Sequence, residues 1–90
     1  MKIIKKDGRL ENFQIEKIKT SINNATLSCK SLLNESDLKV LCEDIKNKIN
    51  TIRKDGSNTS SYEVIGVVID VLKDDKFSDI ISLYLNYKKN

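Results

Sequence analysis

The chain has 90 residues, of which 39% are hydrophobic and 32% are charged, and its formal net charge is +3. A chain of this length makes one domain with a single core and leaves little room for a deep catalytic cavity. Its apolar runs fall short of the about 18 residues that cross a bilayer, and its start lacks the long apolar stretch of a secretion signal. We therefore expect one cytoplasmic domain over residues 1–90, without a membrane segment.

The first predicted element is a β-hairpin. Ile3 and Ile4 form a short apolar run, Asp7-Gly8 is a strong two-residue turn signal, and residues 10–13 supply the return strand. A type I′ turn needs a positive φ at both central positions, which Gly8 adopts readily and Asp7 tolerates. The sequence thus predicts two strands that join at Asp7 and Gly8.

Two amphipathic helices are predicted next, because apolar side chains recur at spacings of three and four. The first helix carries Ile15, Ile18, Ile22 and Ala25, and the second carries Leu38, Leu41, Cys42, Ile45, Ile49 and Ile52. Asn34 or Ser36 can cap the second helix, and residues 26–33 are expected to form an irregular connection.

Two further helices follow a turn-rich break at residues 54–59. Ser60 to Glu63 predicts a capping box, in which the serine accepts a bond from a backbone amide and Glu63 reaches back. The third helix carries Val64, Val67, Val68, Val71 and Leu72, and after a polar break at residues 73–76 the fourth carries Phe77, Ile80, Ile81, Tyr84 and Tyr87. The fold class is therefore predicted as α+β and mostly helical, a small four-helix bundle capped by an N-terminal β-hairpin or small sheet.

The sequence gives no sign of catalysis or of a metal site. It contains no histidine, no glycine-rich phosphate loop and no nucleophile beside an obvious base. Its two cysteines, Cys29 and Cys42, are expected to be reduced, small buried residues. We interpret the adjacent Asp74 and Asp75 as a surface turn. The protein is therefore expected not to be an enzyme and to hold no metal through its own side chains.

The excess positive charge lies at the start of the chain. Residues 1–19 carry six basic side chains against three acidic ones, whereas residues 20–90 carry ten of each. A local positive field favours an anionic partner. Lys5, Lys6 and Lys17 are candidates for phosphate binding, although strand alternation points Lys5 and Lys6 to opposite faces unless the turn re-aims Lys6. From composition alone, solubilising lysines beside a hairpin explain the same pattern.

The run from Ile3 to Ile18 resembles the opening signature of the ATP-cone family. That signature is a hydrophobic strand, Lys-Arg-Asp-Gly, an acidic residue, an apolar position and then Lys-Ile in the first helix. The segment Ser61-Tyr62-Glu63-Val64 resembles the Ser/Thr-x-x-Ile pattern that opens the third helix of the family. The resemblance covers nearly the whole chain.

The resemblance implies a site for ATP or dATP, with Mg²⁺ as its expected companion. Its phosphate-binding residues would be Lys5, Lys6, Lys17, Ser61 and either Lys88 or Lys89. Without the resemblance, Ser61 is equally well explained as a helix cap and the last two lysines as a solvated chain end.

The same resemblance implies an adenine subsite. Ile3, Phe13 and Ile18 would form its walls, Glu11 would accept a hydrogen bond from the adenine amino group, and Gln14 would contact the base or the sugar. The three apolar residues are also core candidates for any fold of this pattern.

The chain departs from the family pattern at three places. Lys6 replaces an arginine and gives up its bidentate geometry. Residues 77–81 lack the tyrosine and arginine of an Ala-Tyr-x-Arg pattern, and Ile65 is apolar where some members contact adenine. A degenerate cone that binds no nucleotide therefore stays open as an alternative.

The resemblance implies an allosteric module that senses ATP and dATP and regulates a partner. In the family, such a module precedes the catalytic domain of ribonucleotide reductases or follows a zinc ribbon in the repressor of reductase genes. Expected partners are an adenine nucleotide, a reductase or other regulated protein, and a second copy of the chain. The alternatives are a protein-interaction bundle and a weak nucleic-acid-binding module that uses the basic hairpin, although the positive charge is too sparse for a strong footprint on nucleic acid.

Overall fold

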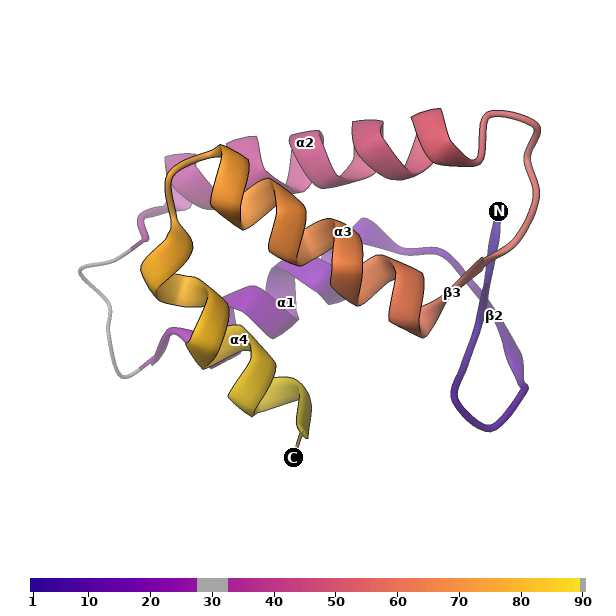
Figure 1. The fold of residues 1–90 in the computed structure, drawn as a ribbon, viewed down its shortest axis with the longest axis horizontal. Coiled ribbons are helices and arrows are strands. Elements are labelled where there is room, and N and C mark those ends of the chain that lie inside the picture. The colour runs from indigo at the N-terminus through magenta and orange to yellow at the C-terminus, as the bar shows by residue number, and fades with distance from the viewer. Residues whose placement is uncertain (28–32, 90) are drawn as a thin grey trace.

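A computed structural model describes residues 1–27 and 33–89 (Figure 1). The elements in chain order are β1 (Lys2–Ile4), β2 (Leu10–Asn12), α1 (Ile15–Ala25), α2 (Glu35–Ile52), β3 (Thr59–Ser60), α3 (Ser61–Asp74) and α4 (Ser78–Lys89). The described residues thus form four helices and a small three-stranded sheet, which confirms the predicted fold class. None of these helices is both long and apolar enough to span a membrane.

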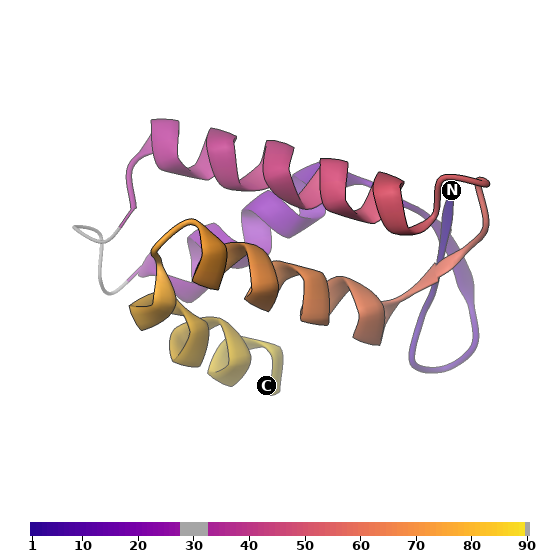
Figure 2. The ribbon, with the colours of Figure 1, turned by 45° about the horizontal axis from the view of Figure 1, so that its top comes forward.

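The strands form a sheet at one end of the helices, in the order β2-β1-β3. β1 pairs antiparallel with β2, with Ile3 opposite Glu11, and parallel with β3, with Ile3 beside Thr59. β3 has two residues and lies in a segment where the sequence predicted only a turn-rich break. This short pairing places the N-terminus of α3 directly beside the hairpin (Figure 2).

The hairpin turn differs from the predicted two-residue type I′ turn. The amide of Lys5 donates to the carbonyl of Arg9 at 2.8 Å, and the amide of Gly8 donates to the carbonyl of Lys5 at 2.9 Å. Gly8 has a φ of 88°, whereas Asp7 keeps a negative φ. The loop therefore has three residues, with Gly8 alone in the left-handed conformation. Asp7 fixes it by accepting bonds from the backbone amide and the Nε of Arg9, at 3.1 and 2.7 Å.

The helix caps agree with the predictions in part. Asn34 caps α2 in a complete capping box with Asp37, the two bonds measuring 2.8 and 3.2 Å. Ser60 caps α3 by accepting from the amide of Glu63 at 3.1 Å, as predicted. The predicted return bond from Glu63 is wrong, because that carboxylate instead accepts two bonds from Arg53, each 2.8 Å, and one from Thr59 at 2.6 Å. This cluster ties the end of α2 to the start of α3.

The apolar stripes of the helices meet in one core, in which α2 lies against α3 and α1 lies against α4 (Figure 1). Its most deeply buried members include Ile22, Leu41, Ile45, Ile49, Val68 and Leu72. Cys42 is buried as predicted, while Cys29 and residues 28–32 of the predicted connection lie outside the described part of the chain. Two predicted stripe positions are wrong, since Ile52 is 48% exposed and Tyr87 is 39% exposed. Both lie near the C-termini of their helices.

The chain turns sharply between α3 and α4. The predicted break begins at residue 73, whereas α3 continues to Asp74. The amide of Phe77 donates to the carbonyl of Leu72 at 2.7 Å, and that of Lys76 donates to Lys73 at 3.3 Å. This is a Schellman motif, whose left-handed position is held by Lys76 with a φ of 72° instead of by glycine. Asp75 at this corner is half-buried and its Oδ2 atom is sealed from solvent, so the interpretation as a surface turn is wrong for Asp75.

Candidate functional site

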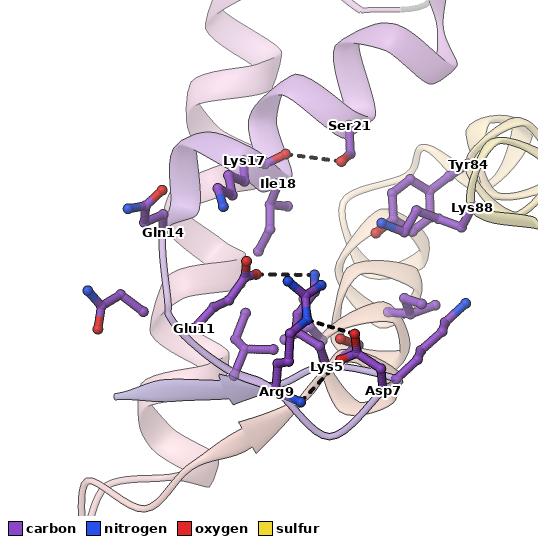
Figure 3. A pocket seen from close by; sticks show the side chains of 16 residues that line it. Lys5, Asp7, Arg9, Glu11, Gln14, Lys17, Ile18, Ser21, Tyr84 and Lys88 are labelled. Carbon is purple, nitrogen blue, oxygen red and sulfur yellow. Dashed lines mark hydrogen bonds and ion pairs between the residues drawn. The ribbon is translucent and has the colours of Figure 1, made fainter. Parts of the chain in front are cut away.

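A cleft of about 420 Å³ opens between the hairpin, α1, the start of α3 and the end of α4 (Figure 3). This volume lies within the range of small-molecule sites, which is roughly 300–1,000 Å³. The predicted site residues that line it are Ile3, Lys5, Lys6, Glu11, Gln14, Lys17, Ile18, Ser61 and Lys88. Phe13 is the predicted residue that does not line it, because its half-buried ring packs against the core. The side chain of Lys89 lies outside the described part of the structure.

The hairpin contributes the two lysines nearest the turn. The regular strand ends at Ile4, and both Lys5 and Lys6 line the cleft, which is the arrangement that the prediction allowed if the turn re-aims Lys6. The Nζ atom of Lys5 lies 3.6 Å from Oε2 of Glu11 on the neighbouring strand. The Nζ atom of Lys6 lies 5.9 Å from the ring centroid of Tyr62. Each cation therefore has a weak interaction within the protein, in a position that a ligand can reach.

Lys88 brings a third cation to the same place from the other end of the chain. Burial lowers the pKa of the Lys88 ammonium, and the positive charges of Lys5 and Lys6 lower it further. Nearby positive charges disfavour the charged form of a half-buried lysine. The cleft therefore presents positive charge that the surrounding protein leaves incompletely balanced.

Two helices add polar groups to this cationic end. Ser61 is the first residue of α3, and its hydroxyl donates to the carbonyl of Ile4 at 3.4 Å. The N-terminus of α3 supplies backbone amides and partial positive charge, which favour an anion. Lys17 lines the cleft from the first turns of α1.

The cleft also includes residues that the sequence analysis did not assign to a site, among them Asp7, Arg9, Asn12, Ser21 and Tyr84. Tyr84 was predicted as a core residue, and it is indeed only 2% exposed, yet it also lines the cleft. Ser21 lines the cleft one turn beyond Lys17, and its hydroxyl donates to the carbonyl of Lys17 at 3.0 Å. Helical spacing could have found both, because Ser21 follows Lys17 by four residues and Tyr84 precedes Lys88 by four.

The apolar part of the cleft wall is formed by Ile3, Ile18, Val64 and Ile65. A cationic end beside apolar walls suits a ligand with an anionic group and a flat apolar ring. Within residues 1–27 and 33–89, no group of three or more histidine, cysteine or acidic side chains is placed to hold a metal ion. The arrangement is thus that of a binding module for an organic anion.

The family comparison agrees with this class of protein. The sequence matches the family model of the ATP cone domain over residues 1–90, and the chain belongs to the ATP-cone family, as the resemblance implied. ATP-cone domains are regulatory, non-catalytic modules that bind ATP or dATP. A search of curated proteins gives no significant match to the chain.

Proposed function

We propose that this chain binds ATP and dATP in the cleft and that nucleotide binding regulates a partner protein. The observation that carries the proposal is the convergence of Lys5, Lys6 and Lys88 at the cleft, where burial first and then the charges of Lys5 and Lys6 lower the pKa of Lys88. Cations held together against their mutual repulsion gain most from an anion of high charge. A triphosphate supplies that charge, and each lysine can bind it as a point-charge partner.

The cleft accommodates the two ends of the nucleotide separately. Lys5, Lys6 and Lys88 bind the phosphates, assisted by Ser61 at the start of α3 and by Lys17 from α1. Because the described residues offer no metal-binding cluster of their own, Mg²⁺ enters with the phosphates.

The adenine lies between Ile3 and Ile18, where Glu11 accepts a hydrogen bond from its amino group and Gln14 contacts the base or the sugar. In the free protein Glu11 is paired with Lys5 at 3.6 Å. Binding therefore exchanges one interaction for two, since Lys5 turns to a phosphate and Glu11 turns to the base.

Regulation follows because the nucleotide contacts elements from both ends of the chain. It links the hairpin, α1, the start of α3 and the end of α4, and so favours one arrangement of their outer surfaces. A ligand shifts such an equilibrium only by its difference in affinity for the two arrangements. A ribonucleotide reductase, a repressor of its genes and a second copy of this chain are the partners that we propose for those surfaces.

Calorimetric titration with Mg-ATP and Mg-dATP tests the proposal. We expect saturable heat, and a loss of affinity of about ten- to a hundredfold in Lys5→Ala and Lys88→Ala, as for a hydrogen bond to a charged group. Lys39→Ala is the matched control, because Lys39 is an exposed lysine of α2 outside the cleft. Absence of saturable heat, or equal affinity in all three variants, contradicts the proposal. Salt-sensitive binding to duplex DNA without nucleotide heat favours the nucleic-acid alternative.

A further inference from the structure

Tyr84 combines a buried ring with a hydroxyl group that faces the cleft. The side chain is 2% exposed and its ring belongs to the core, yet it lines the cleft from α4 (Figure 3). Its hydroxyl group makes no hydrogen bond with a described residue. Among the described residues, the one side-chain oxygen that is both sealed and unpaired is Oδ2 of Asp75. The Tyr84 oxygen is therefore open to the cleft.

This hydroxyl group is suited to contact a ligand. Buried tyrosine hydroxyls are usually hydrogen-bonded, so an unpaired one at the wall of a cleft indicates a partner that enters from outside. Burial raises the pKa of Tyr84 to about 12. The group therefore stays neutral near pH 7 and can both donate and accept a hydrogen bond.

The position of Tyr84 relative to Lys88 decides which part of a nucleotide it meets. The two residues are four apart on α4 and share one face of the helix, so they are separated by about one turn, or 5.4 Å along the axis. That rise is comparable to the separation between a phosphate of a nucleotide and its sugar. With the phosphates at Lys88, the sugar lies at the level of Tyr84.

The opposite wall at this level is also polar. Ser21 lines the cleft from α1, which packs against α4, and its hydroxyl oxygen can still accept a bond while it donates to Lys17. The part of the cleft beyond the lysines thus presents two hydroxyl groups, from Ser21 and Tyr84, between apolar walls (Figure 3). Neutral hydroxyls suit the hydroxyl groups of a sugar better than the charged oxygens of a phosphate.

We propose that the Tyr84 hydroxyl group hydrogen-bonds to the ribose 2′-hydroxyl of the bound nucleotide and so favours ATP over dATP. This inference rests on the proposed function, since it assumes that the phosphates lie at Lys5, Lys6 and Lys88. A site built to bond a hydroxyl group discriminates against the analogue that lacks it, because the partner in the protein is then left unpaired.

The test is Tyr84→Phe, which removes one oxygen and keeps the buried ring. Calorimetry with Mg-ATP and Mg-dATP is expected to show an affinity for ATP about three- to tenfold lower, with the affinity for dATP changed less than about twofold. Tyr87→Phe is the matched control. Tyr87 lies on the same helix outside the cleft, and its hydroxyl accepts a bond from Asn24 at 3.3 Å. Its ratio of ATP to dATP affinity is expected to equal that of the unmodified protein.

The outcomes separate this inference from the proposed function. If the unmodified protein binds neither nucleotide, the proposed function fails and the role of Tyr84 fails with it. If it binds both but Tyr84→Phe weakens them equally, the oxygen has only a structural role and the specificity is overturned. An unchanged ratio with unchanged affinities overturns it as well.

Discussion

The two halves of the molecule follow different rules. Where α2 lies against α3, the contact is made by apolar side chains such as Ile45 and Val68, which are both fully buried. Where the hairpin, α1 and α4 meet, the cleft gathers Lys5, Lys6 and Lys88 from the two ends of the chain. The first region removes apolar surface from water. The second brings like charges together, and in it the hydroxyl group of Tyr84 has no hydrogen-bond partner among the described residues.

This difference indicates which region carries stability and which carries function. Burial of apolar surface is the main favourable contribution to folding, so the α2–α3 region stabilises the fold. Repulsion between the half-buried Lys88 and the cations near it opposes folding, and the proposed anionic ligand would relieve it. Residues that lower stability in the free protein cluster at functional sites. The comparison can be tested by substitutions that separate the two effects.

The largest expected effect comes from the α2–α3 region. Ile45→Ala leaves a cavity at a fully buried position and should lower the free energy of unfolding by about 2–5 kcal/mol. Denaturant unfolding measures this loss. Val40→Ala is the control on the same helix, because Val40 is 56% exposed and its change should stay within about 0.5 kcal/mol. Similar losses of unfolding free energy in both variants would contradict the assignment of Ile45 to the core.

The α2–α3 region is also the part that the sequence predicted best. The stripes of α2 and α3 depend only on spacing along one helix, which the sequence displays directly. The pattern failed at Ile52 because periodicity does not show where a neighbouring helix stops. It failed for the carboxylate of Glu63 because Arg53, ten residues away, comes within 2.8 Å only in the folded chain.

The cleft was predicted less directly, because its members converge only through the fold. Lys5 and Lys88 lie at opposite ends of the sequence. Without the family resemblance, the lysines at the end of the last helix are explained equally well as a solvated chain end. The family resemblance placed Lys88 at the site, but it also placed Phe13 there, whose ring turns to the core. Tyr84 was missed as a cleft residue because its ring continues the apolar stripe of the last helix, which assigns it to the core. Its separation of four residues from Lys88 is the signal that could have placed it at the cleft as well.

Asp75, at the corner between α3 and α4, is a half-buried carboxylate beside the apolar core. Burial, followed by the neighbouring carboxylates of Asp44 and Asp74, raises the pKa of Asp75 to about 6. An acid whose pKa is higher in the folded state adds stability at low pH, and that stability is lost as the pH rises toward 6. Above that pH the ionised Asp75 destabilises the α3–α4 corner.

Replacement of the Asp75 carboxylate tests whether its ionised form destabilises the α3–α4 corner. Asp75→Asn should raise the free energy of unfolding at pH 7.5 by about 1–2 kcal/mol, after allowance for partial solvent screening. The gain should shrink as the pH is lowered and vanish near about pH 3.5, as unfolding curves across this pH range can show. Asp74→Asn is the control, since Asp74 is exposed and pairs with Lys48 at 3.7 Å. A gain at pH 7.5 from Asp74→Asn, or none from Asp75→Asn, would contradict this explanation.

The cleft should show the opposite relation between stability and function. Lys88→Met keeps the length of the side chain and removes a half-buried charge that Lys5 and Lys6 repel. We expect the free energy of unfolding of the ligand-free protein to rise by roughly 0.5–1 kcal/mol at pH 7 while nucleotide affinity falls. Because the pKa of Lys88 is lowered on folding, the gain is present at neutral pH and fades as the pH rises through the folded pKa. Thermal unfolding with and without nucleotide measures both quantities, and a loss of stability would refute the idea of stored repulsion.

The smallest expected effects compare one backbone conformation in the two halves. Gly8 in the hairpin and Lys76 after α3 both have a left-handed φ, of 88° and 72°. A Cβ atom at Gly8 meets no other atom within 4 Å, so Gly8→Ala should cost about 0.5–1 kcal/mol through backbone strain alone. Lys76→Gly removes the same strain and should add up to about 1 kcal/mol at the Schellman position. Opposite shifts in the denaturation midpoint would show that local backbone preference acts alike in both halves, and hence that their difference lies in side-chain charge and burial.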